Sequence, residues 1–289
     1  MIFGSSELIL NADNSIYHLN LLPEDIADTV ITVGDPERVS HVSSKFDSIE
    51  LKKGKREFIT HTGYKNGKRL TVISTGIGTD NIDIVLNELD ALANINLETR
   101  TLHDKIKKLT IIRIGTSGAI QPDIELDSFL ISEYAIGLDA LISNYESTTI
   151  RESAFEAAFL KQVNWSSVKP TPYAVKGDDR LIKLFSKNRI RLGITLTASG
   201  FYAPQFRELR LKVQGKNQFE QIMGFVHENC RLTNLEMETA GIYGLSKLLG
   251  HSAISLNAIL ANRATGEFSK HPKEVVDNLI EYTLQKIAP

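Results

Sequence analysis

Short apolar runs rich in β-branched residues alternate along the chain with segments in which apolar residues recur every three or four positions. The first pattern predicts buried β-strands, and the second predicts amphipathic α-helices. The predicted strands are Val30–Val33, Phe58–Tyr64, Arg69–Thr75, Leu109–Ile114, Ser128–Ile131, Leu192–Ala198, Leu232–Met237 and Ala253–Leu260. The predicted helices are Asn81–Ile95, Glu238–Leu249 and Lys273–Ile287.

A hairpin turn refines this picture. Asn66-Gly67 separates Phe58–Tyr64 from Arg69–Thr75, and this dipeptide is typical of a type I′ turn between antiparallel strands. Strands alternating with helices, together with one antiparallel hairpin, indicate an α/β fold with a mixed sheet. No linker rich in Pro, Gly or Ser divides the chain, so we predict one domain over residues 1–289. The polar stretch Ser143–Asp178 is expected to form helices and loops at a sheet edge.

Composition and charge exclude several classes of protein. The 33 Lys and Arg residues nearly balance the 35 Asp and Glu residues, which argues against a nucleic-acid binder or a polybasic membrane-surface protein. The single cysteine, Cys230, forms no internal disulfide, and with seven scattered histidines it makes no structural zinc site. The first residues lack a basic leader, and no apolar run approaches the ~18 residues of a membrane helix. We therefore expect a cytoplasmic protein.

A helix cap follows the first predicted strand. Asp35 is a good N-cap residue and Pro36 suits the first helical position, while Gly34 lets a ligand approach the backbone. Arg38 then stands in the first helical turn, where a cation opposes the helix dipole unless an anion lies nearby. The alternative is an ordinary cap with a solvated arginine.

Arg113 interrupts a run that otherwise predicts a buried strand. An unpaired buried guanidinium costs several kcal/mol, so this residue needs an internal carboxylate or an anionic ligand. Both alternatives are open on these residues alone. The segment Gly115–Gly118 that follows offers backbone amides and hydroxyls that suit a phosphate group.

Two further loops follow predicted strands. Gly76–Asn81 matches only the first half of a dinucleotide-binding fingerprint. No strand after it ends in the acidic residue that would hold a ribose. The segment therefore predicts a tight turn near a small ligand and not a dinucleotide site. In the other loop, Phe201 can stack on a flat ring while Gln205 and Arg207 hydrogen-bond ring carbonyls and N–H groups. The alternative there is a loop whose aromatic residues pack inward.

Glu236 and Glu238 lie where a strand is expected to meet a helix. Their carboxylates can accept hydrogen bonds from sugar hydroxyls, or they can cap the helix and interact with its dipole. A glycosidase-type acid and base pair also remains open. The chain lacks a Walker A motif, G-x-S-x-G and H-E-x-x-H.

Taken together and in order, these segments resemble the nucleoside phosphorylase superfamily of trimer- or hexamer-forming enzymes, and most closely its uridine phosphorylase branch. The stretches that carry the resemblance are V-G-D-P-E-R-V, R-I-G-T-S-G-A-I-Q-P, F-Y-A-P-Q-F-R and N-L-E-M-E. The resemblance extends from about Ser15 to the last residue. It implies a three-layer α/β/α sandwich with a central mixed sheet.

The resemblance also implies a role for individual residues. Phosphate would contact Gly34, Arg38, Arg113 and Thr116, with Arg56 contributed by a neighbouring subunit. Ribose would contact Glu236, Met237 and Glu238, with His18 reaching its 5′-hydroxyl across a dimer interface. The base would contact Phe201, Gln205 and Arg207. Arg263 stands where purine-specific members carry a catalytic aspartate. The catalytic residues that the resemblance implies are Arg113, Arg207, Gln205 and Arg263.

The implied activity is the reversible phosphorolysis of uridine to uracil and ribose 1-phosphate. Phosphate is then a co-substrate, and no cofactor or metal site is expected, although the family allows a monovalent cation at a dimer interface. We expect a homo-oligomer, a dimer or a trimer of dimers, whose active site is shared across the dimer interface. Neither nucleic acid nor a membrane is an expected partner. The alternatives are a purine nucleoside phosphorylase or nucleosidase of the same fold, and a catalytically silent nucleoside-binding protein.

Overall fold

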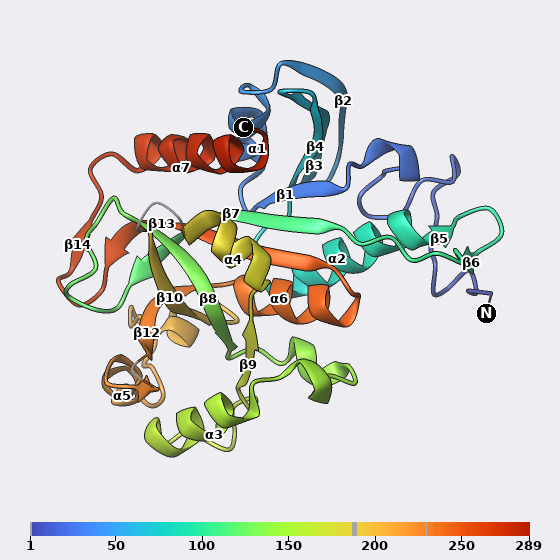
Figure 1. The fold of residues 1–289 in the computed structure, drawn as a ribbon. Coiled ribbons are helices and arrows are strands. Elements are labelled where there is room, and N and C mark those ends of the chain that lie inside the picture. Colours follow the sequence, from blue (N-terminus) through green and yellow to red (C-terminus); the bar gives the residue numbers. More distant parts are fainter. Residues whose placement is uncertain (1, 187–189, 229) are drawn as a thin grey trace.

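The computed structural model describes residues 2–186, 190–228 and 230–289, and Figure 1 shows how its elements are arranged. The helices are α1 Pro36–Ser43, α2 Thr79–Asn94, α3 Ser153–Gln162, α4 Asp179–Phe185, α5 Gln218–Met223, α6 Thr239–Leu248 and α7 Pro272–Ile287. The strands are β1 Thr29–Val33, β2 Ser48–Lys55, β3 Phe58–Lys65, β4 Lys68–Ser74, β5 Ile95–Asn96, β6 Thr101–Leu102, β7 Thr110–Ala119, β8 Phe129–Gly137, β9 Tyr173–Lys176, β10 Arg191–Thr197, β11 Val226–His227, β12 Cys230–Glu236, β13 Ser252–Asn262 and β14 Glu267–Phe268.

One mixed sheet of twelve strands dominates the described residues. Its main path runs β11-β12-β10-β8-β13-β7-β1-β4-β3-β2. Strand β12 also pairs with β7, antiparallel, with Leu235 opposite Gly118. The strands β7, β13, β8, β10 and β12 therefore close into a ring, and we call this part of the sheet the closed half.

The predicted hairpin is confirmed. Strands β3 and β4 pair antiparallel up to Lys65 and Lys68. Asn66 and Gly67 both have positive φ, 47° and 74°, as a type I′ turn requires. The hairpin is extended by β2, which the sequence pattern did not indicate because most of its residues are exposed at the sheet edge.

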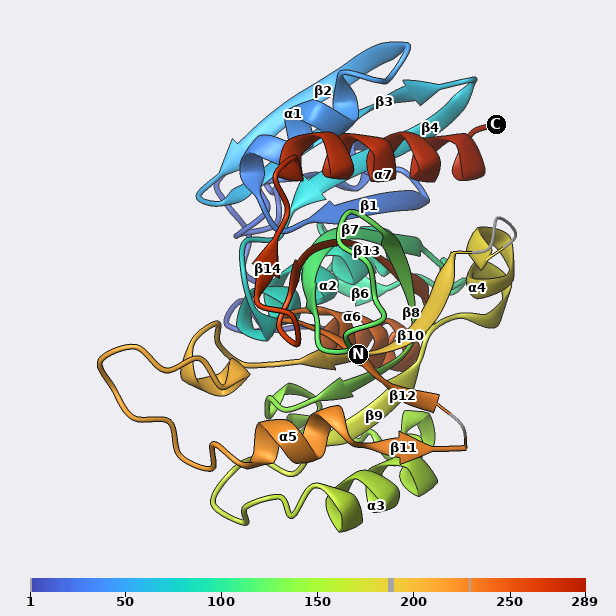
Figure 2. The same cartoon turned by 90° about the vertical axis from the view of Figure 1, so that its left-hand side faces the viewer.

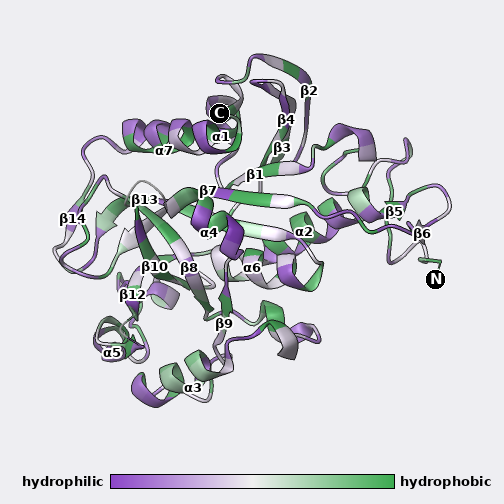
Figure 3. Ribbon diagram, in the orientation of Figure 1, coloured by the Kyte–Doolittle hydropathy of each residue, from purple (hydrophilic) through white to green (hydrophobic). Residues whose placement is uncertain are grey.

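Helices cover both faces of the sheet, as Figures 1 and 2 show. Successive strand residues point to opposite faces, so Ile111 packs into the core beneath α2 and α6, and Ile112 packs into the core beneath α1, α4 and α7. Figure 3 shows β8 and β10 as mostly hydrophobic, while α7 carries both hydrophobic and hydrophilic residues. This arrangement confirms the predicted three-layer α/β/α sandwich with a mixed sheet.

Two predicted strand ends were wrong. Strand β7 continues beyond Ile114 to Ala119, because Gly115–Gly118 pairs with β13 as well as β12. Strand β8 likewise continues to Gly137, where it pairs with β9 and β10. The extension of β7 has no hydrophobic pattern, because its glycine and hydroxyl residues face a cavity and not a core.

The stretch Ser143–Asp178 contains helix α3, as predicted, but it also contains strand β9, which was not expected. The assignment of one domain over residues 1–289 stays a prediction. Among the described residues, no helix has the length and apolar character needed to cross a membrane.

Candidate active site

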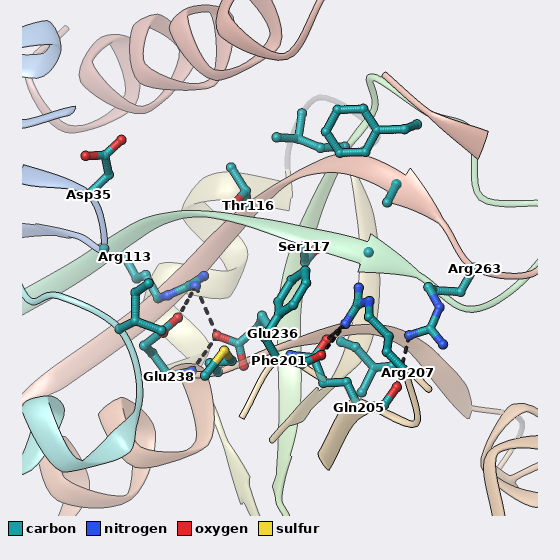
Figure 4. A pocket seen from close by; sticks show the side chains of 18 of the residues that line it. Asp35, Arg113, Thr116, Ser117, Phe201, Gln205, Arg207, Glu236, Glu238 and Arg263 are labelled. Atoms are coloured by element: carbon teal, nitrogen blue, oxygen red, sulfur yellow. Dashed lines mark hydrogen bonds and ion pairs between the residues drawn. The ribbon is translucent and has the colours of Figure 1, made fainter. Parts of the chain in front are cut away.

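A cavity of about 1040 Å³ lies at the carboxyl ends of several strands of the sheet. Its walls come from the segments that follow β1, β4, β10, β12 and β13, and from the part of β7 between Arg113 and Gly118. The parallel strands bring these distant loops to one edge, where open α/β sheets bind ligands. Eleven predicted site residues line this cavity: Gly34, Arg38, Arg113, Thr116, Phe201, Gln205, Arg207, Glu236, Met237, Glu238 and Arg263. Figure 4 shows most of them from close by.

The loop after β1 forms the predicted helix cap. The Asp35 carboxylate accepts a hydrogen bond of 2.9 Å from the Glu37 amide, and α1 begins at Pro36. Arg38 is half-buried, and its Nη1 donates to the carbonyl oxygen of Ile114 at 3.2 Å. Burial, followed by the nearby charge of Arg113, lowers the pKa of Arg38. The arginine is therefore not the solvated residue of the alternative interpretation.

Arg113 is only 5% exposed and is held by two carboxylates. Its Nη2 lies 2.6 Å from Glu238 Oε2 and 3.1 Å from Glu236 Oε2. Burial alone would lower the pKa of Arg113, but the two carboxylates outweigh it and the pKa is raised. The internal ion pair, one of the two alternatives left open by the sequence, is thus present, and a phosphate contact of Arg113 stays a prediction.

The guanidinium of Arg113 folds over Gly115. A Cβ on Gly115 would lie 1.9 Å from Arg113 Nη1, so a side chain there would displace the guanidinium. The same nitrogen, Nη1, donates to Asn257 Oδ1 at 3.0 Å and to Ser255 Oγ at 3.3 Å. The charged group is therefore fixed in place at the cavity wall.

Glu236 and Glu238 both contact Arg113 but have different hydrogen-bond partners otherwise. Glu236 Oε2 accepts hydrogen bonds of 2.9 Å from the amides of Glu238 and Thr239, at the start of α6. Its Oε1 accepts from Thr197 Oγ1 at 2.5 Å. This is the helix-cap alternative, and the predicted ribose contact of Glu236 stays a prediction.

Glu238 is committed at both oxygens as well. Its Oε1 accepts from the amide of Gly78 at 2.9 Å, and its Oε2 receives Arg113. Gly78 has φ 94°, a conformation that favours glycine, so the tight turn predicted after β4 serves to aim this amide. Burial raises the pKa of the Glu238 carboxyl, and Arg113 offsets part of this shift.

The other end of the cavity carries the predicted base-binding residues. Arg207 Nη1 donates to Gln205 Oε1 at 2.5 Å and to the Phe201 carbonyl oxygen at 2.8 Å. The Arg207 guanidinium lies 3.9 Å from the centroid of the Phe201 ring, and Arg263 donates to the Gln205 carbonyl oxygen at 3.0 Å. Burial, and then the charge of Arg263, lowers the pKa of Arg207 to about 10. The aromatic ring of Phe201 is 52% exposed, so it does not pack inward.

His18 and Arg56 do not line the cavity of their own chain. The backbone amide of His18 donates to Glu88, and its Nδ1 lies 2.6 Å from Glu88 Oε1. Arg56 sits in the turn between β2 and β3 with φ 56°, next to Glu57, which does line the cavity. Their roles across a dimer interface stay predictions.

Two polar residues that contact the Arg113 guanidinium were not predicted from the sequence. Ser255 and Asn257 are buried in β13 and contact its guanidinium. Two polar residues spaced by two within the apolar run Ala253–Leu260 were the available signal, since such residues share one face of a strand. Within the described residues, no group of three or more His, Cys, Asp and Glu side chains could hold a metal ion.

The fold and the cavity define a class of α/β protein with a polar cavity at the carboxyl ends of its strands and arginine residues on two sides of it. Residues 28–287 match the model of the phosphorylase superfamily, and the chain belongs to this superfamily.

Several relatives of known function are similar over most of their length. The chain is 30% identical over 275 residues to a uridine phosphorylase of Thermococcus kodakarensis, an alignment that covers 93% of this chain and 85% of that one. It is 26% identical over 251 residues to a DeoD-type purine nucleoside phosphorylase of Caldanaerobacter subterraneus, covering 86% of this chain and 89% of that one. A solved nucleoside phosphorylase of Trypanosoma brucei, described as showing uridine phosphorylase activity, superposes with a TM-score of 0.87 at 27% identity, covering 97% and 99% of the two chains.

Proposed function

We propose that the protein is a uridine phosphorylase, which cleaves uridine with phosphate to give uracil and ribose 1-phosphate. One observation carries this proposal: Arg38, Arg113, Thr116 and Glu238 line the same cavity as Gln205, Arg207 and Arg263. Figure 4 shows Arg113 with Glu236 and Glu238 on one side of this cavity and Gln205, Arg207 and Arg263 on the other. The similarity to named uridine phosphorylases supports the same reaction.

At the first end, Arg38 and Arg113 hold the phosphate. Phosphate is a weak nucleophile, so the main contribution of these residues is to place it beneath C1′ and to balance its charge. Arg113 keeps its contacts with Glu238, Glu236 and Asn257, and it acts on the phosphate through its positive charge. Thr116 adds a hydroxyl, and Gly34 leaves room at the backbone.

Beside Met237, each oxygen of Glu238 accepts a second hydrogen bond, from the 2′- or the 3′-hydroxyl of ribose, since a carboxylate oxygen has two lone pairs. The same carboxylate contacts Arg113, so phosphate and sugar are placed relative to one another by a shared group. Glu236 acts on the ribose indirectly, because its oxygens hold the start of α6 and thereby the position of Glu238.

At the second end, the departing uracil carries negative charge on its carbonyl oxygens. Gln205 Oε1 accepts from Arg207, so the Gln205 Nε2 group is turned outward as a donor for a carbonyl. Arg207 and Arg263 supply positive charge nearby. Arg207 lies over one face of the Phe201 ring, and the uracil ring stacks on the opposite face. These groups stabilise the leaving group without a dedicated proton donor.

The proposal includes a homo-oligomer, a dimer or a trimer of dimers, in which Arg56 and His18 of a neighbouring subunit complete the phosphate and 5′-hydroxyl contacts. No metal takes part in the reaction as proposed, and phosphate is the only co-substrate.

A nucleoside panel tests the choice of base. Purified protein is incubated with phosphate and with uridine, deoxyuridine, thymidine, inosine or adenosine, and free base is measured. We expect uridine to have the highest kcat/KM. A higher kcat/KM for inosine or adenosine would replace the proposal with the purine nucleoside phosphorylase alternative, and no cleavage of any nucleoside would favour the silent binding protein.

A further inference from the structure

A continuous chain of buried hydrogen bonds runs around the inside of the closed half of the sheet. It starts at Arg113 on β7 and passes through one side chain on each of the other four strands before it returns to β7 at Ser117. The four intermediate residues are Asn257 on β13, Ser132 on β8, Thr195 on β10 and Asn234 on β12. All four are completely buried, and of them only Asn257, which contacts Arg113, has appeared above.

The contacts along the chain are short and continuous. Arg113 Nη1 lies 3.0 Å from Asn257 Oδ1, and Asn257 Nδ2 lies 3.0 Å from Ser132 Oγ. Ser132 Oγ lies 2.5 Å from Thr195 Oγ1, which lies 2.9 Å from Asn234 Oδ1. The chain closes with Asn234 Nδ2 at 2.9 Å from Ser117 Oγ.

Arg113 fixes the direction of the first bonds. An arginine can only donate, so the oxygen of the Asn257 amide faces it and the nitrogen faces Ser132. The Asn234 amide fixes the last bonds, because its oxygen faces the hydroxyls of Thr195 and Thr233. Since the Thr195 hydrogen goes to Asn234, Ser132 is the donor at the Ser132–Thr195 contact. Thr195 in turn donates to the amide oxygen of Asn234, and this turns the Asn234 nitrogen toward Ser117.

Ser117 is therefore the terminal acceptor of a chain in which all donors point one way. Its oxygen accepts from Asn234, and among the described residues no acceptor lies within hydrogen-bond distance of its own hydroxyl hydrogen. Ser117 is 8% exposed and lines the cavity, so this hydrogen is available to a bound molecule. Hydrogen bonds that point the same way polarise one another, which strengthens the last donor.

We propose that Ser117 is a further substrate-binding residue, which donates a hydrogen bond to an acceptor oxygen of the nucleoside. We assign Asn234 as the positioning residue that keeps this hydroxyl in the donor orientation. The proposal rests on the proposed function for the identity of the ligand. It predicts that the cavity favours a ligand with an oxygen acceptor at this position, since a donor there would meet the Ser117 hydrogen.

The substitution Ser117→Ala removes the donor at the cavity wall. We expect kcat/KM for uridine to fall about 10-fold while the KM for phosphate is unchanged, since one neutral hydrogen bond is lost. Ser246→Ala is the matched control, because Ser246 Oγ is buried in α6 without a hydrogen-bond partner among the described residues and lies outside the cavity. The same kcat/KM in S117A and S246A would overturn the proposal.

A second variant tests the direction of the chain. In Asn234→Asp the carboxylate can only accept, so it draws the Ser117 hydrogen away from the cavity. N234D should lower kcat/KM for uridine like S117A, and the double variant should be no worse than either single variant. If the double variant loses kcat/KM by the product of the two single losses, Asn234 does not act through Ser117. If N234D does not fold, the comparison of S117A with S246A still tests Ser117 as a donor.

These results are separable from a failure of the proposed function. If wild-type protein cleaves no nucleoside, the proposed function fails before Ser117 is tested. If wild-type protein cleaves uridine with phosphate and S117A does so equally well, only the present inference fails.

Discussion

Arg113 and Glu238, which stand 125 positions apart in the chain, form an ion pair of 2.6 Å in the wall of the cavity. The pair joins the middle of β7 to the start of α6, and a third group, Glu236, lies 3.1 Å from the same nitrogen. One cation between two carboxylates leaves the cluster with an excess of negative charge. The neighbouring Arg38 lowers that excess. In the proposed function, phosphate contacts these two arginines in competition with the carboxylates.

The substitution Arg113→Ala tests this cluster. It removes a phosphate ligand and leaves two buried carboxylates without their cation, so kcat should fall by about 10²–10³ and the free energy of unfolding by about 3–5 kcal/mol. Steady-state kinetics and urea unfolding measure the two losses. Arg191→Ala removes an exposed arginine paired with Asp123 and should change neither. Retained phosphate-dependent turnover in a folded R113A protein would exclude Arg113 from the phosphate site.

Base selectivity should depend on Gln205 and Arg207. In the double variant Gln205→Ala, Arg207→Ala, uracil loses the donors to its carbonyl oxygens, and we expect kcat/KM for uridine to fall at least about 10²-fold. Turnover of inosine, already low, should change much less. Arg210→Ala, an exposed arginine three positions further on, is the matched control. An equal loss for both nucleosides would mean that these residues support the loop and do not select the base.

A shared active site can be tested by mixing two inactive variants. Arg56→Ala and Arg113→Ala damage the same site from different subunits if the dimer prediction holds. Unfolding and refolding the two together creates mixed dimers in which one site contains both wild-type arginines, so roughly a quarter of wild-type activity should return. Each variant refolded alone is the control. No recovery from a mixture that forms dimers would place Arg56 outside the neighbour's site.

The buried carboxyl of Asp139 should make stability depend on pH. Burial raises its pKa above 3.8, and hydrogen bonds from the Leu141 amide at 2.8 Å and from Tyr173 Oη at 3.0 Å only partly oppose this. The folded state therefore holds a proton that the unfolded state has released, so stability falls as pH rises from about 4 through the folded pKa.

In Asp139→Asn this slope should disappear, because an amide does not titrate. Urea unfolding of both proteins between pH 4 and pH 7 measures it, and wild type should lose stability relative to D139N as pH increases. A relative gain in wild-type stability over this range would show that the carboxylate is stabilised in the folded state.

The sequence was sufficient for the architecture because most strands have buried, continuous apolar runs and α2, α6 and α7 have a clear apolar face. It was not sufficient for β2 and β9, which are short or exposed strands without a distinctive pattern. The five cavity segments were found because each carries polar or glycine residues at the end of an apolar strand. The partners of those residues could not be found in this way, since contacts such as Arg113 with Asn257 depend on strand order.

Glu236 illustrates the same limit. Two carboxylates in N-L-E-M-E allow a ribose contact or a helix cap, and only the position of the amides of Glu238 and Thr239 distinguishes them. The local sequence contains both possibilities, because a cap residue and a ligand residue are chemically identical.

In the proposed reaction, the arginine-lined end of the cavity delivers phosphate to the sugar of a bound nucleoside. Uridine cleavage is therefore measured with and without phosphate. We expect uracil release by wild-type protein to require phosphate, to saturate with phosphate concentration, and to yield one ribose 1-phosphate per uracil. Uracil release at the same rate without phosphate, with free ribose as the sugar product, would contradict it.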